Sequence, residues 1–481
     1  MLTRRRFVGY SAMASAVLAS HPLLDSVFGQ HPAGISSRRL RLAILGSKYT
    51  LGSDMQNLAD HFLVGYPYDG EWHMPNVQVV SVYVDQRARR AEAAPSGYDR
   101  AMEGNALPRG GTPEQGAAGA HARGARRMAL QQRTEEEALA SGDLSVARSQ
   151  RFGFRLSNNI PDALRCGGDR LAVDAVLTVL EQDGYQLNEK GQILLPSYDF
   201  FQQCTQVFED EKRSVPYFNY RQLSFSFAEA KDMAGSASRL GFPLMSGSAM
   251  PVTWRLPSVD IPLGAEVKEA VMVGVGGFDG ADFDALDAMQ AMLERRKGGE
   301  TGVRAVQLLE GDDVWAAGKA GRWSQDLLSS ALSRSDTPMG LTVLDGRTQD
   351  LVASGVLPQL VKNPAAYCIE YNDGTRATLL MLNGAIRDFN ISVRIAGRDS
   401  FVSNQFFLPP PPNKTYTACL AAKIEKMFKA DVAPYPVERT LLTTGILEAS
   451  MNSRHRLNQL LETPYLSLKY RPPAESQYVR S

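Results

Sequence analysis

Two apolar runs separated by a helical pattern constrain the fold of this chain more than any other feature. Residues 39–45 (RLRLAIL) and 77–84 (VQVVSVYV) are rich in aliphatic and β-branched side chains, which is typical of buried strands. Residues 54–63, which lie between them, carry apolar side chains at the spacing of one helix face. A strand, a helix and a strand in this order predict one βαβ unit.

The same alternation continues to about residue 249 and predicts a Rossmann-like, doubly wound parallel sheet. The further strands are expected at 173–180, 215–218 and 242–249, and the further helices at 144–152, 198–210 and 228–240. Strands that alternate with helices are joined by crossovers, which leave the strands parallel. Ligands of such sheets bind beyond the carboxyl ends of the strands, so the residues that follow each strand are site candidates.

The pattern changes after residue 258, where strands follow one another at hairpin-like spacing. The expected strands are 267–275, 303–309, 367–371, 377–382 and 390–395, and the expected helices are 283–296, 417–429 and 436–456. Asp373-Gly374 is a strong turn signal between two of these strands. The second half is therefore predicted to be an α+β domain with a mostly antiparallel open sheet.

These boundaries divide the chain into a signal (1–33), a first domain (38–258), a second domain (259–465) and a tail (466–481). The first domain contains an insertion at 87–142 that is rich in Ala, Gly, Arg and Glu and nearly free of aromatic residues. Such a composition offers little to a hydrophobic core, so we interpret it as a solvated, mobile segment. A binding role for its arginines is the alternative.

The first residues resemble a twin-arginine export signal. Three arginines, Arg4 to Arg6, precede Phe7, and an uncharged stretch follows at 8–20. That stretch is shorter than the about 20 apolar residues of a spanning helix. We therefore expect the protein to be exported by the twin-arginine pathway to the periplasm or beyond, with no stable membrane insertion after cleavage. A cytosolic protein with a chance basic terminus is the alternative.

The composition argues against several kinds of partner. Lysine plus arginine and aspartate plus glutamate both number 52, so the chain has no net charge and no sign of a nucleic-acid partner. The four cysteines form no CxxC motif and no histidine pair has zinc-ligand spacing, so no metal site is predicted. Buried free thiols are the default for the cysteines, with disulfides as the alternative in an exported protein.

Three stretches, taken with this order of domains, resemble a known family. They read GFPLMSGSAMPVTWRLP, GVGGFDGADFDALDAM and PYPVERTLLTTGILEASMNSRHR. The chain resembles the glucose–fructose oxidoreductase and myo-inositol dehydrogenase-like (Gfo/Idh/MocA) family over about residues 39–460, without the insertion. The resemblance implies binding of NAD or NADP, action on a sugar or polyol, and a homo-oligomer that pairs through the open face of the second sheet. It also agrees with twin-arginine export, because the cofactor must be loaded before transport.

The turn after the first strand is where a sheet of this kind holds the pyrophosphate of a dinucleotide. It contains Gly46, Ser47 and Gly52 but lacks the middle glycine of G-x-G-x-x-G, so a plain tight turn is the alternative. Asp85 ends the second strand, where an acidic side chain binds ribose hydroxyls or merely caps the strand. Glu181 opens the polar loop after the fourth strand and is a further candidate for cofactor binding, with a solvated loop as the alternative.

The catalytic motifs that the resemblance implies are altered in this chain. The family's Glu-Lys-Pro motif is replaced by Asn219-Tyr220-Arg221. We assign Asn219 to cofactor binding and Arg221 to catalysis. Arginine keeps its proton near neutral pH, so Arg221 is expected to hold a substrate oxygen or a carboxylate. A catalytic histidine is replaced by Asp284, with Asp287 left to bind substrate. Ordinary polarity at the surface or core edge is the alternative for both sites.

Three further residues complete the candidate site. Lys190, in the loop after the fourth strand, is the candidate proton carrier, because a desolvated amine can lose its proton. Trp254 and Arg255 offer a stacking face and a fork of donors to a sugar, although a tryptophan at a domain seam is as often part of the packing.

The sequence therefore supports one main hypothesis and two alternatives. The main hypothesis is an exported oxidoreductase that binds NAD or NADP and acts on a sugar or polyol. The alternatives are a non-catalytic exported protein that binds a saccharide or a partner, and an NAD-dependent glycoside hydrolase on the same scaffold. Only the first and the third require a bound nucleotide.

Overall fold

The computed structural model describes residues 38–86, 142–339 and 351–480. The predicted signal and all but the last residue of the predicted insertion lie outside the described residues.

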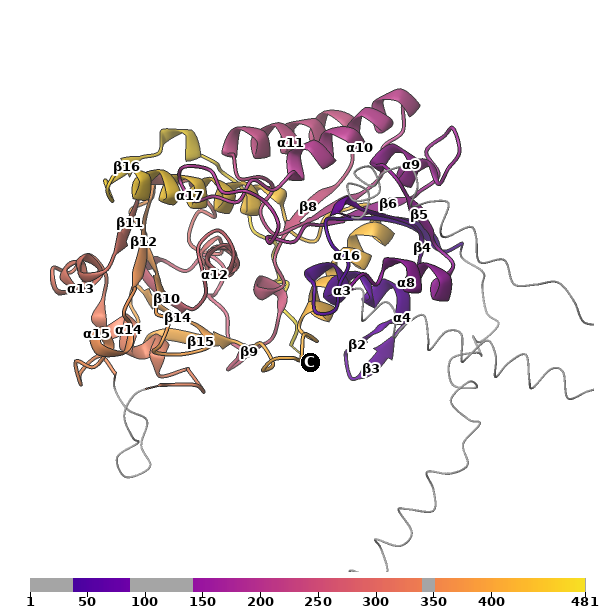
Figure 1. The fold of residues 1–481 in the computed structure, drawn as a ribbon. Helices are drawn as coiled ribbons and strands as arrows, with labels where there is room; N and C mark the ends of the chain where they lie inside the picture. Colours follow the sequence, from indigo (N-terminus) through magenta and orange to yellow (C-terminus); the bar gives the residue numbers. More distant parts are fainter. Residues whose placement is uncertain (1–37, 87–141, 340–350, 481) are drawn as a thin grey trace, which may run out of the picture. The chain divides into compact units, whose positions relative to one another are not determined.

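The first sheet has six strands, all parallel to their neighbours (Figure 1). In chain order they are β1 (Leu40–Gly46), β4 (Val77–Val84), β5 (Arg155–Ser157), β6 (Ala175–Val179), β7 (Tyr217–Tyr220) and β8 (Leu244–Gly247). Their order across the sheet is β5-β4-β1-β6-β7-β8. Counted along the chain this is 3-2-1-4-5-6, the order of a Rossmann fold, so the predicted fold class is confirmed for this half.

Helices cover both faces of this sheet, which explains why its strands are apolar on both sides. In β1, Leu42 and Ile44 belong to one buried cluster, whereas Ala43 and Leu45 belong to another. The cluster of Leu42 includes residues of α3 (Asp54–Ala59), α4 (His61–Val64) and α8 (Ser145–Phe152). The cluster of Ala43 includes residues of α9 (Ile160–Arg165), α10 (Ser197–Glu211) and α11 (Phe227–Leu240).

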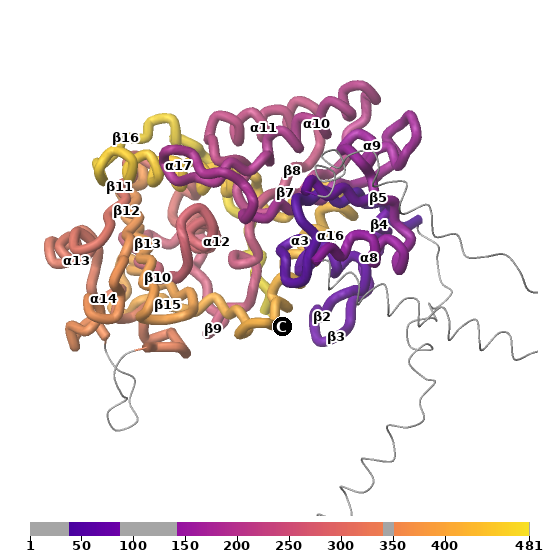
Figure 2. The backbone as a smooth tube through the Cα atoms, in the orientation of Figure 1, coloured from indigo at the N-terminus to yellow at the C-terminus, as the bar shows by residue number. Residues whose placement is uncertain are grey.

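Helix α16 (Thr417–Ala430) also packs on the first sheet, although it comes late in the sequence (Figure 2). Its buried side chains, Ile424 and Phe428 among them, join the cluster of Leu42. A two-stranded hairpin, β2 (Tyr66–Tyr68) and β3 (Glu71–His73), is tied to the same helix by hydrogen bonds to its Glu425. The packing of the first sheet therefore uses residues from beyond the sequence boundary at 258.

The second sheet has eight strands and is antiparallel except where β10 pairs with β13, so the predicted mostly antiparallel sheet is confirmed. Its strands are β9 (Arg255–Leu256), β10 (Val267–Gly274), β11 (Val303–Glu310), β12 (Ala365–Tyr371), β13 (Arg376–Met381), β14 (Phe389–Ile395), β15 (Val402–Phe406) and β16 (Leu461–Glu462). Their order across the sheet is β16-β11-β12-β13-β10-β14-β15-β9.

Both faces of the second sheet carry helices. Residues of α12 (Ala281–Leu293) and α17 (Val437–His455) pack on one face with Ala270 and Met272 of β10. Val271 and Val273, which point the other way, pack against α14 (Gln325–Leu332), α15 (Leu357–Leu360) and Val314 of α13 (Asp312–Lys319). The face over β10 is therefore covered by helices of the same chain, and the homo-oligomer that the resemblance implies stays a prediction.

Helices α12 and α17 are joined by a buried ion pair. Arg439 of α17 donates two hydrogen bonds to Glu294, which directly follows α12, at 2.9 and 2.6 Å. Both side chains are almost fully buried. Tyr470 also donates to Glu294, at 3.0 Å, so the C-terminal segment closes over the same carboxylate. The pair fixes the angle of α12, whose first turn carries site residues.

All four cysteines are free thiols, three of them buried and Cys166 half-buried. Among the described residues, no cluster of three or more metal-ligating side chains occurs. No helix in the part of the chain that the structure describes is long and apolar enough to cross a membrane.

Candidate functional site

The strand order of the first sheet puts its topological switch point at the carboxyl ends of β1 and β6, where sheets of this kind bind ligands, and we call the ligand site expected there the crevice. The chain leaves β1 toward one side of the sheet and β6 toward the other, and ligands bind where this reversal occurs. Ser47 follows β1, Glu181 comes two residues after β6, and Arg221 follows β7. Three of the predicted site residues therefore meet at one edge of the sheet, as the sequence analysis expected.

The β1–α3 turn is shaped by Gly46 and Gly52. A Cβ on Gly46 would lie 2.3 Å from Met55 Sδ, so only glycine lets α3 pack this closely against the strand. Gly52 has a φ of +78°, which favours glycine. Ser47 Oγ accepts a hydrogen bond from the backbone N–H of Glu181 at 2.7 Å. The two glycines and Ser47 thus fix the turn and join it to the loop after β6.

The hydrogen-bond donors of this turn are engaged within the chain. Ser53 caps α3 by accepting the N–H of Gln56 at 3.1 Å. The N–H of Gly52 donates to Gln56 Oε1 at 2.6 Å. The N–H of Met55 donates to Glu181 Oε1 at 3.1 Å. In this conformation the first turn of α3 holds a carboxylate of the protein itself.

Tyr49 lies in the middle of the turn but does not crowd the crevice. Its ring is buried in the core below α3, and its hydroxyl donates a hydrogen bond to Asp60. Burial, together with Asp60, raises the pKa of the Tyr49 hydroxyl well above its usual value. The bulky residue that the sequence shows at this position is therefore a core residue.

Asp85 and Asn219 stand at strand ends but have partners within the protein. Asp85 is buried and accepts hydrogen bonds from the hydroxyls of Tyr83 at 3.1 Å and Tyr185 at 3.3 Å. Asn219 is buried and donates to the carbonyl of Gln222 at 2.8 Å, which shapes the chain after β7. Asp85 is at the position expected for a ribose ligand, and its role in cofactor binding stays a prediction.

An ion-pair cluster joins three elements around Arg221. Its Nη1 lies 2.8 Å from Asp54 Oδ2 at the start of α3, and its Nε lies 3.3 Å from Asp284 Oδ1 in the first turn of α12. The three side chains are mostly buried and keep between 16 and 22% of their surface exposed. We call Asp54, Arg221 and Asp284 the Arg221 cluster.

The backbone holds Arg221 in an unusual conformation. Its φ of +66° is rare for a residue with a side chain. The N–H of Arg221 donates to the carbonyl of Gly247 at 3.0 Å, and its own carbonyl accepts from Ser246 Oγ at 2.6 Å. The neighbouring strand β8 thus aims the guanidinium at the two carboxylates.

Burial shifts the carboxyls at this edge toward neutral pH. Burial raises the pKa of Asp284 to about 6, against the opposing effect of Arg221, which favours the charged form. This is close to the about 6.5 of an unperturbed histidine, the residue that Asp284 replaces in the resemblance. Burial and the charge of Asp54 raise the pKa of Glu181 to about 7. Both groups are therefore able to exchange protons near neutral pH.

Asp287 lies one turn further along α12 and holds the end of β8. It accepts the N–H of Ser248 at 2.8 Å, while a Cβ on Gly247 would lie 2.9 Å from the same carboxylate oxygen. Its other oxygen is buried without a hydrogen-bond partner among the described residues. Burial raises the pKa of Asp287 to about 7. Its first role is to fix α12 against the first sheet, and substrate binding stays a prediction.

Arg255 is committed elsewhere, although the sequence suggested a substrate ligand. It is buried, donates to Asp260 Oδ1 at 2.9 Å and lies over the ring of Tyr478 at 4.2 Å. Trp254 stacks edge-on against Phe407, with ring centroids 6.4 Å apart. These two residues pack the junction of β9 and β15, and the contacts of Arg255 within the described chain include no member of the Arg221 cluster.

Lys190 lies in a loop that is tied to the second sheet's helices. The N–H of Ile193 in this loop donates to Asp279 Oδ2 at 2.6 Å, just before α12. A Cβ on Gly191 would lie 3.2 Å from Arg454 Nη1 of α17. In the described structure no contact joins Lys190 to the Arg221 cluster, and its role as proton carrier stays a prediction.

Solved structures resemble this fold. Myo-inositol 2-dehydrogenase from Lactobacillus plantarum has a TM-score of 0.47 and 11% sequence identity, over 88% of this chain and 99% of that one. Myo-inositol dehydrogenase from Lactobacillus casei, solved with NAD(H) and myo-inositol, has a TM-score of 0.46 and 10% identity, over 88% and 97%. A probable dehydrogenase from Thermotoga maritima has a TM-score of 0.46 and 9% identity, over 89% and 100%. No family model and no curated protein matches the sequence.

Asp54 completes the cluster but is not among the site residues predicted from the sequence. An aspartate at the first position of a helix is common because it stabilises the helix N-terminus. Its sequence context therefore carried no sign that Arg221, 167 positions later, would pair with it. The pairing depends on β1 and β7 lying on either side of β6 in the sheet.

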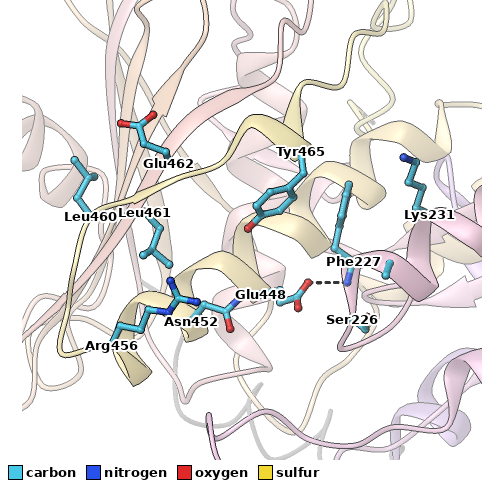
Figure 3. Close-up of a pocket in the computed structure, with 11 residues that line it drawn as sticks. Ser226, Phe227, Lys231, Glu448, Asn452, Arg456, Leu460, Leu461, Glu462 and Tyr465 are labelled. Atoms are coloured by element: carbon cyan, nitrogen blue, oxygen red, sulfur yellow. Dashed lines mark hydrogen bonds between the residues drawn. The ribbon is translucent and has the colours of Figure 1, made fainter.

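A separate pocket of about 610 Å³ lies between α11, α17 and the C-terminal segment (Figure 3). Glu448 of α17 is hydrogen bonded to the backbone N–H of Phe227 at its wall, at 2.7 Å. Phe227 also faces Tyr465, with ring centroids 5.7 Å apart. The lining residues include no member of the Arg221 cluster, so this pocket is distinct from the crevice.

Proposed function

We propose that this protein is an exported oxidoreductase that binds NAD or NADP at the crevice and acts on a sugar or polyol. One observation carries the proposal: the parallel sheet with strand order 3-2-1-4-5-6 opens, at its switch point, onto the Arg221 cluster. Ionisable side chains with raised pKa values beside such a crevice are what acid–base chemistry requires. The dinucleotides in structures such as the Lactobacillus casei enzyme make NAD the first cofactor to test.

The reaction that fits these groups is oxidation of a secondary alcohol. A nicotinamide nucleotide held at the crevice would supply the acceptor for the hydride of the alcohol carbon. The chain must then take the hydroxyl proton, which leaves a carbonyl product, the reduced nucleotide and one proton on the protein. Ionised Asp284 is the best-placed acceptor, since its pKa of about 6 leaves it mostly ionised at pH 7. Arg221 beside it stabilises negative charge on the substrate oxygen as the proton leaves.

Asp284 and Lys190 are alternative carriers of that proton. Asp284 pairs with Arg221 and keeps 18% of its side chain exposed, whereas the loop of Lys190 is bound to Asp279. The geometry therefore favours Asp284. The two assignments predict that different variants lose turnover.

A specific observation also favours a second function, a non-catalytic saccharide-binding protein. The N–H groups at the start of α3, which would hold pyrophosphate, are engaged by Glu181 and Gln56. A protein that had lost its nucleotide would be free to fill the place with its own side chain. Such a protein would still bind a polyhydroxylated ligand at the Arg221 cluster.

Two measurements separate these functions. The purified folded protein is denatured, and the supernatant is examined for released dinucleotide by absorbance and mass. The same preparation, stripped of nucleotide, is titrated calorimetrically with NAD and NADP and then assayed for nucleotide reduction with sugars and cyclitols. Bound nucleotide together with sugar-dependent reduction supports the oxidoreductase. Saccharide binding without nucleotide binding in either experiment favours the second function.

Export by the twin-arginine pathway belongs to the same proposal. The support is the sequence itself, with Arg4, Arg5 and Phe7 preceding an uncharged stretch. A protein that folds around a nucleotide has a physical reason to use a pathway for folded proteins, because nucleotides are made in the cytoplasm.

A further inference from the structure

The carboxylate of Glu181 occupies the place where the β1–α3 turn would receive a pyrophosphate. Glu181 Oε1 accepts the N–H of Met55 at 3.1 Å, and the N–H of Asp54 also stabilises this carboxylate. The residue is held there by its own backbone, whose N–H donates to Ser47 Oγ at 2.7 Å. In sheets with this strand order, the pyrophosphate lies against the turn after the first strand. Glu181 thus makes the contacts that a phosphate oxygen would make.

The turn fits a pyrophosphate only after Glu181 has moved. With Glu181 in place, the pyrophosphate would lose its main donors and would meet two carboxylates, those of Glu181 and Asp54. Asp54 is balanced by Arg221 at 2.8 Å, whereas Glu181 has no ion pair within 4.0 Å in the described part of the chain. Glu181 is therefore the side chain whose charge opposes a bound nucleotide most directly.

The surroundings of Glu181 make its charge depend on pH. Burial is the largest cause that raises its pKa to about 7, and the charge of Asp54 adds to it. The N–H groups of Met55 and Asp54 and the guanidinium of Arg221 oppose the rise. Asp284, on α12, acts on the same group of charges through Arg221. Lys48, in the turn, is paired with Asp183 at 2.6 Å in the loop after Glu181.

We propose that Glu181 is a built-in competitor for the pyrophosphate of NAD or NADP, and that the nucleotide binds when this side chain has left the turn in its protonated form. The inference rests on the proposed function, since it assumes that the crevice takes a dinucleotide. Once neutral, the carboxylic acid no longer repels the phosphates, and its O–H can donate to one of them. At any pH at which Glu181 of the free protein is ionised, binding of the nucleotide therefore takes up a proton.

The affinity for the nucleotide should fall as the pH rises. Below about pH 6 Glu181 is already protonated, so nucleotide affinity is highest and independent of pH. Well above pH 7 each further pH unit costs about tenfold in affinity, because one proton must be bound for each nucleotide.

The test is calorimetric titration of the full chain with NAD and NADP at pH 6, 7 and 8, in buffers with different ionisation enthalpies. In the parent protein we expect the Kd to rise about fivefold between pH 7 and 8, with uptake of close to one proton at pH 8. Glu181→Gln keeps the shape of the side chain and its acceptor oxygen but removes the charge. This variant should bind at least about tenfold more tightly than the parent at pH 8, with no linked proton and no pH dependence.

A matched control and a ligand-free measurement complete the experiment. Glu189→Gln, an exposed position in the same loop, should keep the pH dependence of the parent. Without nucleotide, the parent should lose thermal stability between pH 6 and 8 relative to Glu181→Gln, because a raised carboxyl pKa favours the folded state only while the group is protonated.

The outcomes separate this inference from the proposed function. Nucleotide binding by the parent with no pH dependence, or a Glu181→Gln variant with the parent's slope, overturns the role of Glu181 and leaves the proposed function standing. Absence of nucleotide binding by the parent and by Glu181→Gln at every pH overturns both. Equal stability of the two proteins across the pH range also overturns the role of Glu181.

Discussion

Arg221 Nε lies 3.3 Å from Asp284 Oδ1, an ion pair that joins the end of β7 in the first sheet to the first turn of α12. Each residue stands where the family resemblance expects a group that carries a proton. Arg221 cannot release its proton near neutral pH, whereas burial brings the pKa of Asp284 to about 6. The usual acid–base residues are absent from the sequence, and our proposal assigns their function to Asp284.

We expect Asp284→Asn to lower kcat by about 10²- to 10⁴-fold, the range for loss of a general base. In the parent, activity should rise with pH through about 6 as Asp284 ionises. This acidic limb of the pH profile should be absent from the variant. The measurement is a pH profile of NAD(P)-dependent sugar oxidation.

Asp326→Asn is the matched control, because this aspartate of α14 is 80% exposed. Lys190→Met decides between the two proton carriers. If Lys190→Met abolishes turnover and Asp284→Asn does not, the proton passes through Lys190 as the sequence analysis predicted.

Arg221→Ala should weaken substrate binding and shift the acidic limb of the same pH profile upward. Removing the guanidinium leaves Asp54 and Asp284 without their shared counter-charge, so the pKa of Asp284 should rise further. The measurement is KM together with the pH profile of kcat/KM. Arg213→Ala, which removes a half-exposed partner of Asp174, should leave both unchanged. An unshifted limb would show that Arg221 does not tune Asp284.

Thermal stability should fall as pH rises from about 5 to 8. Burial raises the pKa of Asp279, Glu181 and Asp287 to about 7 and that of Asp284 to about 6. Each folded-state pKa lies above the unfolded value, so the stability that these groups contribute is present when they are protonated and is lost as pH rises through 6 to 7. Calorimetric unfolding at several pH values measures this, and Asp287→Asn should flatten the dependence. A midpoint that rises over this range would contradict the assignment.

Glu294→Ala should destabilise the protein by about 3–5 kcal/mol, because it leaves the buried guanidinium of Arg439 without its carboxylate. The matched control is Glu209→Ala. Glu209 pairs with Arg239 at 2.7 Å, but both side chains are exposed, so the loss should be at most about 1 kcal/mol. Urea unfolding of the two variants gives the comparison. Equal losses would mean that the buried pair is no stronger than the exposed one.

Replacing both Arg4 and Arg5 by lysine should trap precursor in the cytoplasm. The twin-arginine translocase requires the arginine pair, and lysine keeps the charge while removing the guanidinium. Cell fractionation and blotting measure the distribution. Export that continues in a strain without the translocase would exclude this pathway.

Much of the local structure was determined by the sequence itself. The strand predicted at 77–84 coincides with β4. Helix α10 is one residue longer at both ends than the helix predicted at 198–210, and α11 begins one residue before the helix predicted at 228–240. These elements have long periodic patterns, and their identity depends on side chains that are near in sequence. The short strand β5 and the β2–β3 hairpin were missed, because three-residue strands carry too little pattern.

The tertiary structure decided what the candidate residues contact. Arg255 and Trp254 looked like ligands of a sugar, yet Arg255 is bound to Asp260 and Tyr478 in the core. Asp54 looked like an ordinary helix start, yet it pairs with Arg221. The pKa of Asp284 depends on burial and on a guanidinium far away in sequence, and Glu181 meets Met55 because β1 and β6 are neighbours in the sheet. Periodicity fixes which face of an element is buried, whereas charge pairing and desolvation depend on distances that exist only once the sheets and helices have packed.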